Sequence, residues 1–385
     1  GRKLPYQNQQ VSGSIGGPIL LDRLHFFGNY EYEREPRTFA YVNKGIFKQF
    51  NRDISKNRTN KLWLTRIDLQ LSPATRFSVR GSGAQNRFFN GGGSGNSPIN
   101  FRGYSREGDQ YFGTLTSVLG GNSVNEMKGG FTFYLRADQG AIDNWGGSTT
   151  MPYNPVLDGG TAVFRFPGYT IGTTPLALVL NTQIFRNDFT TSYEAGGRHD
   201  VKMGFDYMRF ANDFRWCLRC TGDVDLRGKG LTLTADLIGS IFPSATFTDA
   251  STWKNDRMHL LNDGARYVRH SLSDTGHTYK VRRHVWAGWY QDDWQVSDAF
   301  TLNMGVRYDW DSNGHNEKLR FDPFVPGNQK RDSNNFAPRV GFNVRLDDAT
   351  VIRGGYGLYF AFAPNDGVQQ TTGYNCAIGT PTCPR

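Results

Sequence analysis

Residues 300–310 read FTLNMGVRYDW, and apolar or aromatic residues alternate with small, polar or charged ones along the whole stretch. In an extended strand successive side chains point to opposite faces, so a period of two separates them into two sets. One face would carry Phe300, Leu302, Met304, Val306, Tyr308 and Trp310, and the other Thr301, Asn303, Gly305, Arg307 and Asp309. Because no helix produces this alternation, the stretch is predicted to be a strand with one apolar and one polar face.

The same alternation recurs along the chain and predicts about twelve strands in about six hairpins. The expected ranges are 9–20, 24–33, 60–71, 76–87, 109–119, 123–138, 183–196, 200–212, 284–296, 300–310, 336–346 and 350–362. Most of them slightly exceed the roughly 9 to 11 residues that a tilted strand needs to cross a bilayer. No linker interrupts the series, which indicates one extended all-β architecture.

The connections between these strands are of two kinds. Short turns are expected at residues 21–23, 72–75, 119–122, 197–199, 297–299 and 347–349. Long irregular loops are expected at 34–59, 88–108, 139–182, 213–283 and 311–335, with a short helix near 233–241. Antiparallel up-and-down transmembrane barrels have short periplasmic turns and long extracellular loops. We therefore expect a transmembrane β-barrel with its long loops facing outward.

The composition of the 385 residues agrees with a barrel and excludes other classes. Hydrophobic residues make up 37% and mean hydropathy is -0.56, so no window approaches the ~18 consecutive apolar residues of a membrane-spanning helix. Aromatic residues reach 14%, which suits a lipid-facing surface with interfacial rings. The net charge of +9 is spread over strands and loops without a basic run, which argues against nucleic-acid binding.

The chain shows no constellation of residues typical of an enzyme, a metal site or a cofactor site. The histidines are scattered, and the glycine run at 91–95 lacks the Gly-Lys-Ser/Thr ending of a phosphate-binding loop. The cysteines Cys217, Cys220, Cys376 and Cys383 all fall in expected loops. Local disulfides in an oxidising compartment are favoured over a metal site, and their pairing stays open.

Five motifs, the first made of two segments, resemble one family in their order along the chain. They are 13–19 (GSIGGPI) followed by 25–31 (HFFGNYE), then 290–294 (YQDDW), 301–308 (TLNMGVRY), 335–342 (NFAPRVGF) and 353–357 (RGGYG). Together they resemble the barrel strands of TonB-dependent outer-membrane receptors of the Oar-like, carboxypeptidase-regulatory-like type. Each motif is weak alone, but their order across nearly the whole chain makes the resemblance specific.

The resemblance implies a barrel of about twenty-two strands with a plugged lumen in the outer membrane of a Gram-negative bacterium. It also implies three partners: outer-membrane lipid, a large nutrient ligand, and a TonB-type energy-coupling protein that binds through an N-terminal region. Neither a TonB box, a plug nor an aromatic-tipped final strand is recognisable in this sequence. Residues 1–385 are therefore expected to be an internal barrel segment that lacks the plug and the C-terminal strands.

Charged residues at polar strand positions are the candidate site. In an intact receptor the lumen-facing set would line the ligand route or hydrogen-bond the plug, but the same residues could simply pair with one another. The set comprises Arg66, Asp68, Arg136, Asp206, Arg307, Asp309, Arg339, Arg345 and Arg353. Asp292 falls on the ring-bearing face near a strand end, next to Asp293, and is expected to be solvated there.

The leading functional expectation is energy-coupled import of a large nutrient captured by the long loops. Alternatives are a structural or adhesive surface barrel that only displays its loops, a passive porin, and a soluble all-β carbohydrate-binding protein. The transported ligand stays open among siderophores, cobalamin, glycans and peptides, because the loops carry no recognisable motif.

Overall fold

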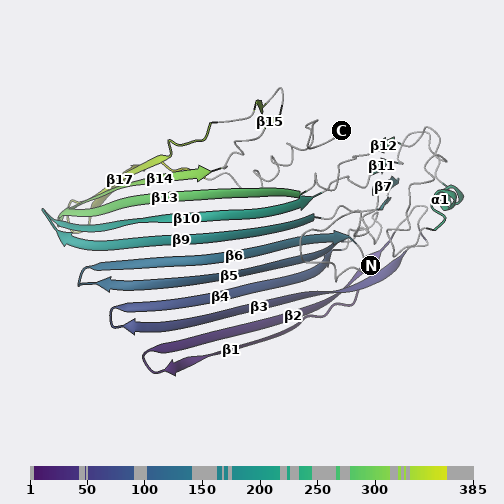
Figure 1. Ribbon diagram of the computed structural model, residues 1–385, viewed down its shortest axis with the longest axis horizontal. Coiled ribbons are helices and arrows are strands. Elements are labelled where there is room, and N and C mark those ends of the chain that lie inside the picture. The colour runs from purple at the N-terminus through teal and green to yellow at the C-terminus, as the bar shows by residue number, and fades with distance from the viewer. Residues whose placement is uncertain are drawn as a thin grey trace.

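The computed structural model describes residues 4–42, 48, 51–90, 102–140, 163–166, 169–171, 176–216, 223–225, 234–244, 266–268, 278–312, 320–321, 325–326 and 330–361. Twelve long strands form one antiparallel sheet in which each strand lies beside the next long strand along the chain (Figure 1). They are β1 (Gln9–Leu20), β2 (Leu24–Tyr41), β3 (Arg52–Ser72), β4 (Thr75–Asn90), β5 (Arg102–Leu119), β6 (Ser123–Gly140), β9 (Leu176–Glu194), β10 (Arg198–Trp216), β13 (Thr278–Ser297), β14 (Phe300–Ser312), β17 (Phe336–Arg345) and β18 (Val351–Gly357). The predicted all-β, up-and-down architecture is confirmed.

Short elements lie at the end of the sheet opposite the short turns (Figure 1). A four-stranded sheet joins β7 (Val163–Phe166), β8 (Tyr169–Ile171), β11 (Asp223–Asp225) and β12 (Arg266–Val268), and β15 (Arg320–Phe321) pairs with β16 (Val325–Pro326). The helix α1 (Ala235–Ile241) forms in the expected region, where the Thr234 side chain accepts a hydrogen bond from the Leu237 N–H at 3.1 Å. Within the described ranges, no helix is long and apolar enough to cross a membrane.

The strands extend further toward the long loops than the alternation predicts. β2 reaches Tyr41 and β3 begins at Arg52, so most of the loop expected at 34–59 is strand. Residues 52–59 read RDISKNRT, which is polar on both faces apart from Ile54 and therefore shows no period of two. Backbone pairing holds them in the sheet nevertheless, with Arg34 opposite Thr59 and Tyr41 opposite Arg52. At the other extreme β18 ends at Gly357, earlier than the expected residue 362.

One turn lies two residues earlier than predicted. β9 ends at Glu194 and β10 begins at Arg198, so the connection is Ala195–Gly197 and not residues 197–199. Gly196 has φ 65° and Gly197 has φ 118°, backbone conformations that glycine adopts without steric cost. His199 therefore belongs to β10, directly opposite Tyr193 of β9 and Trp294 of β13.

The register of the sheet is continuous, which fixes the face of every strand residue. Shifts occur only beside three turns, at Pro18/Leu20, Gln70/Ser72 and Gln295/Ser297. We call the face that carries Arg307 and Asp309 the polar face, and the face that carries Val306 and Tyr290 the apolar face. Because side chains alternate, direct pairing carries this assignment from strand to strand across the sheet.

The apolar face is coated with rings from different strands that pack against one another. Trp63 lies 5.8 Å from Tyr111, Phe185 lies 5.6 Å from Phe205, and Tyr207 lies 4.1 Å from Trp286 between ring centroids. Large apolar side chains on this face remain partly exposed, as with Val306 at 43%. A soluble sheet would bury such a surface, whereas a membrane barrel presents it to lipid.

A substitution at Gly83 of β4 would test how closely the rings of the apolar face are packed. A Cβ at this position would overlap with Trp63 Nε1 and Asp109 Oδ1. We expect Gly83→Ala to lower the free energy of unfolding in lipid vesicles by about 1–3 kcal/mol, the usual cost of overpacking. Gly129→Ala on the same face is the control, because a Cβ there meets nothing within 4 Å. Equal urea midpoints for the two variants would contradict this packing.

Candidate functional site

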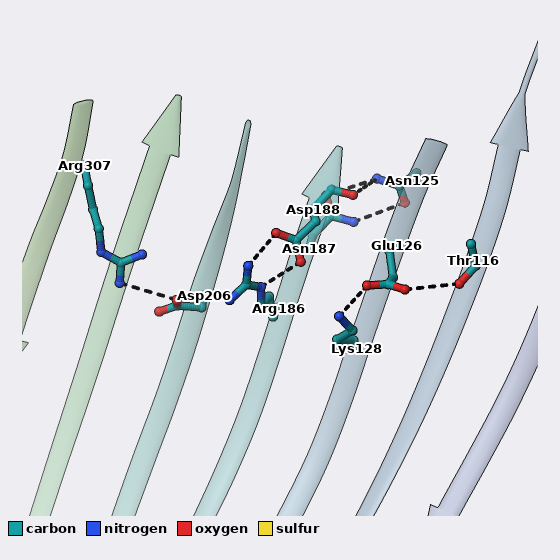
Figure 2. A network of polar contacts seen from close by, with 9 residues as sticks. All are labelled: Thr116, Asn125, Glu126, Lys128, Arg186, Asn187, Asp188, Asp206 and Arg307. Carbon is teal, nitrogen blue, oxygen red and sulfur yellow. Dashed lines mark hydrogen bonds and ion pairs between the residues drawn. The ribbon is translucent and has the colours of Figure 1, made fainter. Parts of the chain in front are cut away.

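A belt of charged side chains crosses the polar face over strands β6, β9, β10 and β14 (Figure 2). On β6, Glu126 forms an ion pair with Lys128 and accepts a hydrogen bond from the Thr116 hydroxyl at 3.4 Å. On β9, Arg186 donates two hydrogen bonds to Asp188, each of 2.7 Å. Paired bonds of this kind fix the orientation of a guanidinium as well as neutralise it.

The centre of the belt is Arg307 of β14. Its Nε lies 3.0 and 3.1 Å from the two carboxylate oxygens of Asp309, and its Nη2 lies 3.5 Å from Asp206 of β10. Both carboxylates are buried, and no described residue forms a hydrogen bond with the enclosed Asp206 Oδ1. Arg307 thus forms ion pairs with two buried carboxylates.

Trp289 of β13 connects the two arginines of the belt. The Arg186 guanidinium lies 4.7 Å from the centroid of the Trp289 ring, and that of Arg307 lies 5.4 Å away. A cation over an indole face is attracted by the ring quadrupole. The belt is therefore continuous through β13, although Trp289 itself carries no charge.

A cavity of about 590 Å³ lies beside the belt, toward β17 and β18. Arg186, Arg307 and Arg339 contribute to its lining, and Arg339 stacks on Tyr359 with its guanidinium 4.3 Å from the ring centroid. Glycines supply much of the remaining wall, namely Gly305, Gly341, Gly355 and Gly357. Among the described residues that line the cavity, none is acidic.

One polar pair in Figure 2 lies on the other side of the sheet. Asn125 and Asn187 exchange two amide hydrogen bonds of 3.2 and 3.1 Å between β6 and β9. The register places both on the apolar face, where Asn125 pairs with Phe189 and Asn187 with Phe205. Each amide satisfies the other, which allows polar groups on a face that is otherwise apolar.

The nine residues expected on the lumen side all fall on the polar face, but they do not form one cluster. Asp206, Arg307 and Asp309 meet in the belt, and Arg339 lies in the cavity. A separate group joins Arg66 and Arg76 to Asp68 at 2.8 and 2.7 Å. The others, Arg136, Arg345 and Arg353, lie elsewhere on the same face, and no described residue forms an ion pair with Arg345 or Arg353.

The expected set omits several members of the site, namely Glu126, Lys128, Arg186, Asp188 and Trp289. Arg186 and Asp188 could have been found from the sequence, because they have the same spacing of two as Arg307 and Asp309. Trp289 could not be found in this way, because its role depends on which strands flank β13.

The expectation that Asp292 is solvated is wrong. Asp292 is 7% exposed, and its Oδ2 lies 2.8 Å from His199 Nδ1. His199 Nε2 lies 3.1 Å from the Ala195 carbonyl oxygen, and its ring stacks on Tyr193 and Trp294 with centroids 5.0 and 5.1 Å away. Both ring nitrogens lie within hydrogen-bond distance of an oxygen acceptor, an arrangement that favours the doubly protonated imidazole. The error follows from placing His199 in the turn.

Other expected features stay untested. Cys217, Cys220, Cys376 and Cys383 lie outside the described residues. In the part of the chain that the structure describes, no group of three or more His, Cys, Asp or Glu side chains is placed to hold a metal ion.

Comparison with known proteins adds a family and a set of similar folds. A family model described as an outer membrane beta barrel domain matches residues 40–382. The outer-membrane transporter YddB from Escherichia coli superposes with a TM-score of 0.55 at 11% identity, covering 91% of this chain and 38% of that protein. The alcaligin outer-membrane receptor FauA from Bordetella pertussis gives 0.52 at 12% identity, with 92% and 41% covered.

The pyoverdine receptor FpvA from Pseudomonas aeruginosa PAO1, bound to pyoverdine, gives a TM-score of 0.52 at 11% identity, with 90% of this chain and 44% of that protein covered. The chain thus spans about two fifths of the length of each of these proteins. At such identity the likeness concerns the fold. No curated protein matches the sequence.

Proposed function

The chain belongs to the outer membrane beta barrel domain family, a family of membrane barrels and not of enzymes, and from that premise we propose that it forms barrel wall in a TonB-dependent transport receptor of the Oar-like type. The protein resides in the outer membrane, which removes the soluble carbohydrate-binding alternative. In a transmembrane barrel the apolar face meets lipid, so the polar face lines the interior. Residues 1–385 would then be one barrel segment.

The observation that carries this proposal is the cavity on the polar face. A wall that only has to satisfy its own charges would pair its cations with carboxylates, as Arg66 and Arg76 do with Asp68. In the cavity, Arg186 and Arg307 have carboxylate partners in the belt, but Arg339 forms no ion pair with a described residue, and no described lining residue is acidic. An interior surface with unbalanced donors supports contact with something that enters the barrel, which is the task of a transport receptor.

The proposal includes partners that lie outside this chain. A large nutrient would be captured by the long extracellular loops, and passage through the barrel would draw energy from a TonB-type protein acting on a plug. The solved receptors that share this fold include proteins named for alcaligin and pyoverdine, and this supports a nutrient of comparable size without identifying it.

Comparison of nutrient depletion in defined media tests the proposal. Deletion of the gene in its host is expected to leave one compound unconsumed, and deletion of the TonB-type protein should leave the same compound unconsumed. Re-expression of the full protein should restore consumption only when the coupling protein is present. Restored uptake without the coupling protein would instead indicate a passive porin.

A structural or adhesive surface barrel is the second candidate, and one observation favours it. Two long connections fold together at the loop end, where β7 and β11 pair in parallel and Phe166 of β7 lies 6.2 Å from Phe242 beside α1. Such an ordered loop unit could serve display as well as capture. No change in nutrient depletion on gene deletion, together with loss of surface attachment, would favour display.

A further inference from the structure

We infer that the cavity beside the belt is a binding site for an anionic group, a carboxylate or a phosphate, anchored by Arg339. The inference rests on the proposed function, because it assumes that the polar face lines a space that an occupant enters. It goes further by assigning a chemical class to what the cavity holds and one residue as its main contact.

The charges around the cavity favour an anion. Arg186, Arg307 and Arg339 line it, and the carboxylates that pair with the first two lie behind them in the belt. Arg186 uses Nε and Nη2 on Asp188, and Arg307 uses the same two nitrogens on Asp309. The Nη1 group of each donates to no described residue, so both arginines are held in place with a donor to spare.

Arg339 differs from the other two arginines in its partners. No described residue forms an ion pair with it, and its contact is the ring of Tyr359 at 4.3 Å. Stacking on an aromatic face orients the guanidinium plane while leaving its five N–H donors available. Arg339 is therefore the cation of the cavity that an incoming anion would neutralise most directly.

The glycines of the wall make room for that anion. The register places Gly305 opposite Arg339, Gly341 opposite Asn303 and Gly355 opposite Gly341. All of these positions point to the polar face, where any larger side chain would project into the cavity. The volume of about 590 Å³ falls within the range typical of small-molecule sites.

Other ligand classes fit the cavity less well. A cation would meet three arginines without a lining carboxylate. A sugar ring would compete with the arginines for the aromatic rings, because Arg186 and Arg307 lie over Trp289 and Arg339 lies over one face of Tyr359. Carboxylates and phosphates match the forked donors of arginine in geometry and charge.

The anionic group has two possible sources, and one experiment with two measurements separates them. The full protein is purified from outer membranes in detergent, and citrate and inorganic phosphate are titrated by calorimetry, with glucose as the neutral control. If free anions enter the cavity, Arg339→Gln should weaken the tighter of the two anions at least 10-fold, and Arg339→Lys should retain part of the affinity.

If the group is instead a carboxylate of the polypeptide that fills the barrel, added anions should not bind. Arg339→Gln should then lower the thermal unfolding midpoint in anion-free buffer, because an internal ion pair is lost. Arg353→Gln is the matched control for both measurements, since it lies on the same face, removes the same charge and does not line the cavity.

The inference is overturned if Arg339→Gln alters neither anion affinity nor the unfolding midpoint more than Arg353→Gln does. Its failure is separable from failure of the transport proposal. Suppose that anion binding depends on Arg339 but that deletion of the gene leaves nutrient depletion unchanged. The anion site would then be supported and the transport proposal overturned. Nutrient uptake that needs the coupling protein, together with no effect of Arg339→Gln, would support transport and overturn the anion site.

Discussion

Val306→Arg is expected to abolish barrel assembly in the outer membrane. Val306 lies in the middle of β14 on the apolar face, where it pairs with Tyr290 and Pro338 and is 43% exposed. An arginine that faces lipid at the bilayer midplane costs roughly 2–4 kcal/mol, a large share of the stability of a marginal barrel. Heat-modifiable migration of the outer-membrane fraction on gels measures the folded barrel directly.

Asn303→Arg on the same strand is the control for this substitution. Asn303 lies on the polar face and donates a hydrogen bond to Asp293 at 2.7 Å, so a guanidinium there would lie beside a carboxylate. We expect it to assemble at close to the wild-type level. Equal loss of the folded band for the two variants would show that the faces are assigned wrongly.

Arg307→Ala should produce the largest loss of stability within the charged belt. It removes the nearest cation from Asp309 and Asp206, whose side chains are only 8% and 13% exposed. Leaving a buried charge without its partner costs about 3 kcal/mol or more. Urea unfolding in lipid vesicles, followed by tryptophan fluorescence, should show a correspondingly lower midpoint.

Arg66→Ala provides the matched comparison, because Arg66 and Asp68 repeat the Arg-x-Asp arrangement of Arg307 and Asp309. Asp68 keeps a second partner in Arg76 and is more exposed, at 19%. We expect a loss below about 1 kcal/mol, as for other accessible ion pairs. If Arg66→Ala lowered the free energy of unfolding as much as Arg307→Ala does, burial of Asp206 and Asp309 would not contribute to the cost of losing their partner.

The fold was predictable from sequence wherever lipid contact imposes a period of two. Residues 300–310 show that period fully, and the strand found there differs only by two residues at one end. Residues 52–59 show none, because both faces of the strand are polar apart from Ile54, and backbone pairing with β2 holds them in the sheet. Sequence pattern thus identifies the part of a strand that has one apolar side and misses the rest.

The sequence predicted which face of the sheet the site residues lie on, but not which of them contact one another. Alternation alone is enough to place Arg307 and Asp309 on one side, since they lie two positions apart. Which groups meet across strands depends on register, and register depends on turn positions. A shift of two residues in one turn was enough to hide the partner of Asp292.

The stacked histidine has a consequence for the order in which the barrel assembles. Tyr193 and His199 belong to one hairpin and can meet as soon as β9 and β10 pair. Asp292 lies 93 residues beyond His199, and Trp294 comes from the same late strand. Closing so long a segment is slow compared with forming a hairpin. After the hairpin forms, only the imidazole face that stacks on Tyr193 would be covered, and the other face would stay open until β13 pairs with β10. The fluorescence of Trp294 would then report that pairing step.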